Sequence, residues 1–121
     1  MAVNYGSKRI VVGAHYGLRD WLVQRFTGGL MAVFTLVVLA QVLFAKGPIG
    51  YDTWAGVFAS QWMKVLTFAV IVALIWHAWV GVRDIWMDYV QPVGTRLLLQ
   101  VLSIIWLVGC GGWALQVLWR L

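Results

Sequence analysis

Three long apolar runs dominate the pattern of hydrophobic and polar positions along the chain. No charged residue lies in residues 26–45, 65–82 or 97–119. At about 1.5 Å per residue, such runs are long enough to cross a membrane core about 30 Å thick. The pattern therefore predicts an all-α membrane protein with three transmembrane helices.

Polar residues and breakers set the expected bounds of these helices. The helical pattern of the second run continues to Tyr89, beyond its last uncharged residue. Pro92 then ends it, because proline has no backbone N–H and disfavours a helix at the residue before it. We expect one domain over residues 1–121, with an N-terminal segment at 1–20 and transmembrane helices at about 21–45, 65–89 and 96–119.

Two further patterns refine this outline. Residues 46–64 contain glycine, proline and several aromatic residues, and they predict a loop with a short interfacial helix from Tyr51 to Trp62. The cluster Gly109-Cys110-Gly111-Gly112 in the third run predicts that another helix approaches closely there.

Composition and charge support a membrane location and indicate an orientation. The chain is 63% hydrophobic and 11% charged, whereas about a quarter of the residues in soluble domains are charged. The basic residues lie singly between the apolar runs, so the net charge of +5 does not indicate nucleic-acid binding. Because cytoplasmic segments are enriched in Lys and Arg, we expect a cytoplasmic N-terminus and a C-terminus on the opposite side. The N-terminal side carries six basic residues, Lys8, Arg9, Arg19, Arg25, Arg83 and Arg96, against Lys46, Lys64 and Arg120.

His77 is the only histidine in an apolar run. Ionisable residues inside membranes usually face the bundle interior and have a function, so His77 is either an interhelical hydrogen-bonding residue or a ligand of a metal or haem. Ala73 and Gly81, one turn away on each side, leave room for a flat macrocycle, although small residues also serve plain helix packing. No second ligand lies in the apolar runs, so a six-coordinate haem would need one from another polypeptide or another copy.

Charged residues near the expected cytoplasmic face could complete such a site. Arg19 and Arg25 could bind haem propionates, or they could be ordinary positive-inside residues. Asp84 and Asp88 return to nearly the helix face of His77, with Asp88 about 16 Å above it. Tyr89 could donate a hydrogen bond to a quinone carbonyl with Asp88 beside it, or it could be an aromatic-belt residue, which physical chemistry alone favours.

The segment His77-Ala78-Trp79-Val80-Gly81, followed by Asp88-Tyr89-Val90-Gln91-Pro92, resembles the signature of a known family. That family is the bacterial succinate dehydrogenase hydrophobic membrane anchor subunit, the smaller of two anchors. The upstream segment Arg19-Asp20-Trp21-Leu22-Val23-Gln24-Arg25 resembles the family's segment before its first helix. The resemblance covers about residues 18–120.

The resemblance implies a membrane-anchor domain in a four-subunit complex of the bacterial inner membrane, with the C-terminus periplasmic. Its partners would be a flavoprotein that oxidises succinate, an iron–sulfur subunit, and a cytochrome b anchor that completes the helical bundle. The two anchors would share haem b and contribute to ubiquinone reduction, in the tricarboxylic acid cycle and aerobic electron transport. By the same resemblance His77 is an axial ligand of the haem iron, Tyr89 binds ubiquinone, Asp88 supports the quinone site, and Arg25 lies near both. Arg19 stands where the best-known members carry a histidine.

Other functions are compatible with parts of this pattern. In a haem-free anchor or assembly factor, His77 would make only a packing hydrogen bond. A small proton-coupled transporter is disfavoured, because no carboxylate lies within the apolar runs. A fumarate reductase anchor would run the reaction in the opposite direction, and its preferred quinone would distinguish it.

Overall fold

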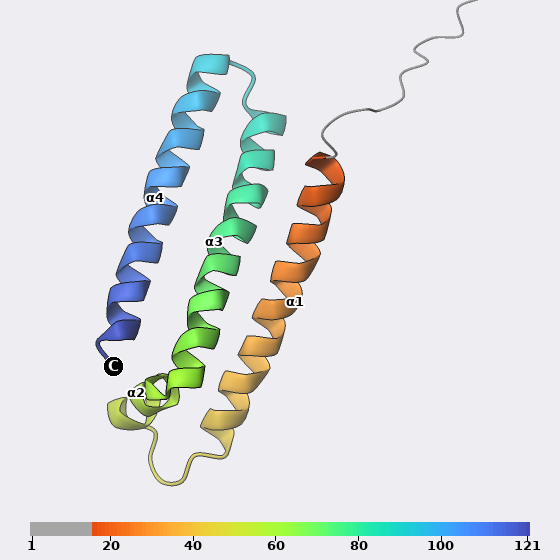
Figure 1. Ribbon diagram of the computed structural model, residues 1–121. Coiled ribbons are helices and arrows are strands. Elements are labelled where there is room, and N and C mark those ends of the chain that lie inside the picture. The colour runs from red at the N-terminus through yellow and green to blue at the C-terminus, as the bar shows by residue number, and fades with distance from the viewer. Residues whose placement is uncertain (1–15) are drawn as a thin grey trace, which may run out of the picture.

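A computed structural model describes residues 16–121, which form helices connected by short loops and contain no strand. Three of these helices are long and apolar enough to cross a membrane, which confirms the predicted all-α class with three spans. Figure 1 shows their arrangement. The helices are α1 (Tyr16–Leu43), α2 (Tyr51–Ala59), α3 (Gln61–Tyr89) and α4 (Val93–Trp119).

The helix bounds differ from the expected ones mainly at the starts of α1 and α3. Of the predicted N-terminal segment, residues 16–20 are already helical, while residues 1–15 lie outside the described part of the chain. The short helix α2 ends at Ala59 rather than at Trp62, because Ser60 is extended (φ −68°, ψ 147°). Helix α3 therefore begins directly after it, at Gln61.

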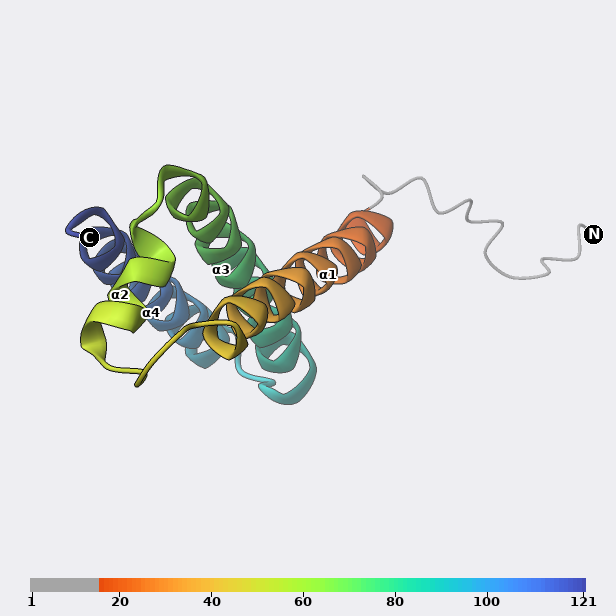
Figure 2. The same cartoon turned by 90° about the horizontal axis from the view of Figure 1, so that it is seen from below.

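Helix α3 lies between α1 and α4, and both of them pack against it along its length. Figures 1 and 2 show the same order from two directions, with α2 close to the start of α3. One end of the bundle holds the start of α1 and the turn at residues 90–92, and we call it the turn end. The opposite end holds α2 and the C-terminus, and we call it the α2 end.

The α3 face in contact with its neighbours follows a seven-residue repeat. Its buried residues are Met63, Val70, Ala73 and Val80, which are separated by seven, three and seven positions. This spacing is that of the a and d positions of a left-handed helix pair. His77, seven residues after Val70, falls on the same seam.

Helix α1 presents polar residues to this seam, also at multiples of seven positions. The Gln41 side-chain amide donates to Met63 Sδ at 3.4 Å, and Thr27 Oγ1 lies 3.0 Å from His77 Nδ1. Near the turn end, Asp20 accepts a hydrogen bond from Arg83. These pairs fix an antiparallel register between α1 and α3.

A separate set of contacts joins α3 to α4. Gly111 is buried, and a methyl group added there would collide with the end of the Ile75 side chain, so α3 contacts the predicted glycine cluster through this side chain. Near the turn end, the Trp86 indole donates to Ser103 Oγ at 2.9 Å. Arg96 Nε donates to the Val90 carbonyl at 3.0 Å, which closes the turn between the two helices.

Candidate functional site

His77 lies between α1 and α3, with its imidazole ring against the backbone of α1. Its Nδ1 is 3.0 Å from Thr27 Oγ1, and its Cε1 lies 3.9 Å from where a Cβ on Gly28 would be. The histidine therefore faces the bundle interior, as expected of an ionisable group in an apolar helix.

Thr27 supplies the hydrogen-bonding environment of the imidazole. Its side chain is almost completely buried, and its hydroxyl lies 2.5 Å from the Val23 carbonyl four residues earlier. Such a bond to the i−4 carbonyl is the usual way a helix accommodates a threonine. Within residues 16–121, Nε2 of His77 has no hydrogen-bonding partner. Nδ1 is thus hydrogen-bonded to Thr27, and Nε2 can coordinate a ligand.

The small residues around His77 serve helix packing inside the chain. Ala73 is buried, and Gly81 lies against α1, with the Gln24 amide nitrogen 3.7 Å from where its Cβ would be. Helix α1 therefore occupies the Gly81 side of His77, whereas Ala73 on the other side contributes to the wall of an apolar groove. Any large group that reaches Nε2 has to approach from outside the α1–α3 pair.

The proposed quinone residues lie at the turn end of α3. The helix runs without a break to Tyr89, so the expected rise of about 16 Å from His77 to Asp88 applies. Asp84 and Asp88 are exposed, and Tyr89 is 80% exposed. The structure brings Asp88 and Tyr89 together at the helix end, and it separates them from His77 by three turns.

The two arginines predicted to bind propionates are both exposed on α1. The Arg25 guanidinium lies over the Trp21 ring, 5.5 Å from its centroid, in the range of a cation–π contact. Arg25 is two residues before Thr27, which places it about 200° around the helix. It therefore projects away from α3 and does not contact His77.

A charged pair that the sequence analysis missed ties α1 to α3 near the turn end. Arg83 donates to Asp20, and both side chains are about four-fifths buried. The Arg83 Nε and the Gln24 side-chain oxygen are buried, and neither has a hydrogen-bonding partner within residues 16–121. Asp20 and Thr27 are seven residues apart and so lie on the same helix face. This spacing was the one sequence feature that could have indicated that Asp20 faces α3.

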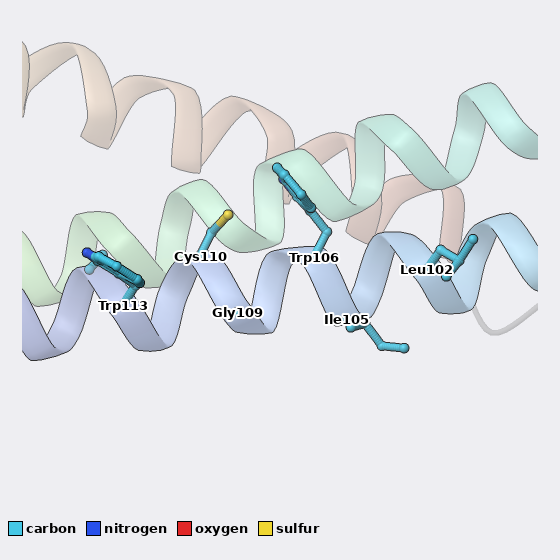
Figure 3. A pocket seen from close by; sticks show the side chains of 7 residues that line it. Leu102, Ile105, Trp106, Gly109, Cys110 and Trp113 are labelled. Carbon is cyan, nitrogen blue, oxygen red and sulfur yellow. The ribbon is translucent and has the colours of Figure 1, made fainter.

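Apolar grooves mark the outer surface. A groove of about 720 Å³ runs along α1 and α3 beside His77, and Thr27 and Ala73 contribute to its wall. A second groove, about 760 Å³ in volume, lies on α4 (Figure 3). Trp106, Cys110 and Trp113 project from one side of that helix. Gly109 lies between them, with nothing within 4 Å of where its Cβ would be.

These residues fit a haem ligand better than a metal site built by one chain. Residues 16–121 contain no group of three or more His, Cys, Asp or Glu side chains placed to hold a metal ion. A haem iron can be held by a single histidine from one chain, and within residues 16–121 no hydrogen bond engages Nε2 of His77. The donor set on this chain is thus compatible with half of a haem site.

Residues 16–121 thus form a three-span helical bundle with a histidine between two helices and apolar outer grooves, which is the architecture of a small multi-pass membrane protein. Residues 4–111 match the family described as succinate dehydrogenase/fumarate reductase transmembrane subunit, and the chain belongs to this family. It is 40% identical over 103 residues to a succinate dehydrogenase hydrophobic membrane anchor subunit of Coxiella burnetii. That alignment covers 85% of this chain and 89% of the relative.

Proposed function

We propose that this chain anchors a succinate dehydrogenase complex in the bacterial inner membrane and there provides one axial ligand to haem b. Its turn end would face the cytoplasm and form part of the ubiquinone-reduction site. The observation that carries this proposal is the environment of His77, whose Nδ1 lies 3.0 Å from Thr27 Oγ1 while Nε2 has no hydrogen-bonding partner among residues 16–121. Family membership and the named relative support the dehydrogenase assignment.

The haem assignment rests on this chain's own residues. With haem bound, His77 would hold its iron together with a ligand from the cytochrome b partner, and the group would supply one-electron transfer. Helix α1 holds the imidazole from one side through Thr27 and Gly28. Arg19 and Arg25 supply positive charge between His77 and the turn end, where propionates would be neutralised.

The quinone assignment rests on the exposed end of α3. A quinone head group would reach this end through the apolar phase and would meet the Tyr89 hydroxyl as a hydrogen-bond donor. Asp88, which is exposed beside it, would supply protons. The iron–sulfur and flavoprotein subunits would dock on the same side, so electrons and protons would arrive at one surface.

The partner anchor would cover part of the apolar outer surface. The α4 groove contains two tryptophans and an unoccluded Gly109, which permits close approach of a second helix. The groove along α1 and α3 is another apolar surface, and its wall includes Thr27, which contacts His77.

The first test is the His77→Ala variant of the purified complex. We expect loss of the b-type signal in the reduced-minus-oxidised spectrum, because the variant removes the iron ligand. Gln41→Ala is the matched control, because it also removes an α1–α3 contact but leaves the imidazole in place. An unchanged haem content in His77→Ala would exclude the ligand assignment and favour a haem-free anchor.

The second test separates quinone chemistry from anchoring. Tyr89→Phe removes only the hydroxyl, and we expect ubiquinone reduction to fall about tenfold or more. Succinate oxidation with a soluble artificial acceptor should remain at the wild-type rate. Tyr51→Phe is the control, because this exposed tyrosine lies at the α2 end. Equal loss of both activities in Tyr89→Phe would instead indicate a structural role.

A further inference from the structure

Thr27 is the polar residue in direct contact with the imidazole of His77. Its side chain is 4% exposed, and its hydroxyl oxygen has three polar neighbours. These are the carbonyls of Val23 at 2.5 Å and Gln24 at 3.4 Å, and Nδ1 of His77 at 3.0 Å. A hydroxyl has one proton and two acceptor lone pairs. The two carbonyls can only accept, so the hydroxyl proton goes to one of them.

Because the Thr27 hydroxyl proton goes to a backbone carbonyl, it is not available for the bond to His77, and this decides which atom donates in that bond. The close Val23 carbonyl takes the Thr27 proton, so Oγ1 must accept from Nδ1 and the ring carries its proton there. In a neutral imidazole the other nitrogen is then an unprotonated acceptor. The bond therefore selects the tautomer in which Nε2 has a free electron pair.

The backbone around the ring supports the same orientation. The imidazole edge lies against Gly28 of α1, and Val80 and Ala73 on the flanking turns of α3 are buried. The ring therefore has helix α1 on its Nδ1 side. An intrachain hydrogen bond and close packing together limit its rotation.

We infer that Thr27 is a positioning residue for His77, which fixes the imidazole tautomer and ring orientation and so tunes the binding of the haem iron at Nε2. This inference rests on the proposed haem function. A partner that accepts the other ring N–H of a ligating histidine raises the basicity of the ligand, and its loss typically lowers metal affinity about 10–100-fold. A more basic imidazole favours the ferric state, so the same bond holds the haem midpoint potential down.

The test compares Thr27 variants in the purified, assembled complex. Thr27→Val keeps the shape of the side chain but cannot accept a hydrogen bond, and Thr27→Ser keeps the hydroxyl. We expect Thr27→Val to transfer haem to excess apomyoglobin about 10–100-fold faster and to shift the midpoint potential upwards. Thr27→Ser should remain close to the wild type in both measurements.

The matched control is Thr35→Val. Thr35 lies on the same helix and makes the same type of bond, from its hydroxyl to the Met31 carbonyl at 2.8 Å, but it is exposed. A general effect of removing a threonine hydroxyl from α1 would appear in this variant too. If Thr27→Val does not assemble, Thr27→Ala provides the same test with a smaller side chain that also has no acceptor.

The outcomes separate the two assignments. Haem loss in His77→Ala together with a wild-type potential and haem-transfer rate in Thr27→Val would overturn the role of Thr27 and leave the ligand assignment intact. Poor assembly of Thr27→Ala with an unshifted potential would show a structural role only, and it would also overturn the inference. Retention of haem by His77→Ala would overturn the proposed function and, with it, this inference.

Discussion

Three polar residues on α1 each contact one residue on α3. Of these contacts, only the Asp20–Arg83 pair joins two oppositely charged side chains. Both side chains are mostly buried, at 20% and 24% exposed. Pairs at the surface contribute less than about 1 kcal/mol, whereas breaking a buried pair costs about 3–5 kcal/mol. The partly buried position of this pair places its contribution between the two.

We expect Asp20→Asn and Arg83→Gln each to destabilise the chain, with a coupling energy of about 1–3 kcal/mol in a double-mutant cycle. The measurement is detergent-induced unfolding of the purified complex for both single variants and the double variant. Asp84→Asn is the control, because Asp84 is 57% exposed and lies 3.6 Å from Arg83. Strictly additive effects of Asp20→Asn and Arg83→Gln would show that the pair contributes no interaction energy.

Among the helices, α3 is the one against which both other long helices, α1 and α4, pack. Its contact with α1 uses polar pairs on a heptad seam, whereas its contact with α4 depends on a glycine. Gly111 allows Ile75 to lie against the α4 backbone, while Gly112, one residue later, has nothing within 4 Å of where its Cβ would be. Neighbouring glycines in one cluster thus have different surroundings.

This difference gives a paired prediction for Gly111→Val and Gly112→Val. We expect Gly111→Val to destabilise the α3–α4 pair by about 1–3 kcal/mol, because the added methyl groups overpack the contact with Ile75. Gly112→Val should cost much less, since both variants change helix propensity equally. Thermal unfolding of the complex in detergent measures both. Similar losses would indicate that the cluster acts through the helix backbone rather than through packing.

At the scale of the whole molecule, the helix order determines which charged segments share a side. Residues 16–20 and the turn at residues 90–92 lie at the turn end, and α2 and the C-terminus lie at the α2 end. The basic residues at or near the turn end are Arg19, Arg25, Arg83 and Arg96, against Lys46, Lys64 and Arg120 at the other. Because basic residues favour the cytoplasmic side, this distribution supports the proposal that the turn end faces the cytoplasm.

We therefore expect a bacterial alkaline phosphatase fused after Leu121 to be active, because that enzyme needs the periplasm to form its disulfides. The same enzyme inserted at Gln91 should be inactive. Green fluorescent protein at the same two positions is the reciprocal control, because it fluoresces when it remains in the cytoplasm. Phosphatase activity at Gln91 with none at Leu121 would reverse the proposed orientation.

The candidate site was only partly accessible to sequence reasoning. His77 was identifiable because an imidazole in hydrocarbon is costly, and Asp88 and Tyr89 because a helix places them on or beside the same face. Thr27 and the Asp20–Arg83 pair were missed. Their contacts are with residues about fifty positions or more away in the chain. A threonine in an apolar run gives no signal of such a contact, because its hydroxyl can bond to a carbonyl of its own helix.

The three spans, their approximate ends and the histidine inside the second one could be predicted from the amino-acid sequence, because bilayer thickness and the cost of burying charge act on local composition. The tertiary structure was needed to show that α3 is the central helix, that Gly111 rather than Gly109 contacts Ile75, and that Gly81 lies against α1. It also placed Nδ1 of His77 beside Thr27 Oγ1, with no partner for Nε2 among residues 16–121. These features depend on the register between helices, which is fixed by a few long-range contacts that hydrophobic periodicity does not encode.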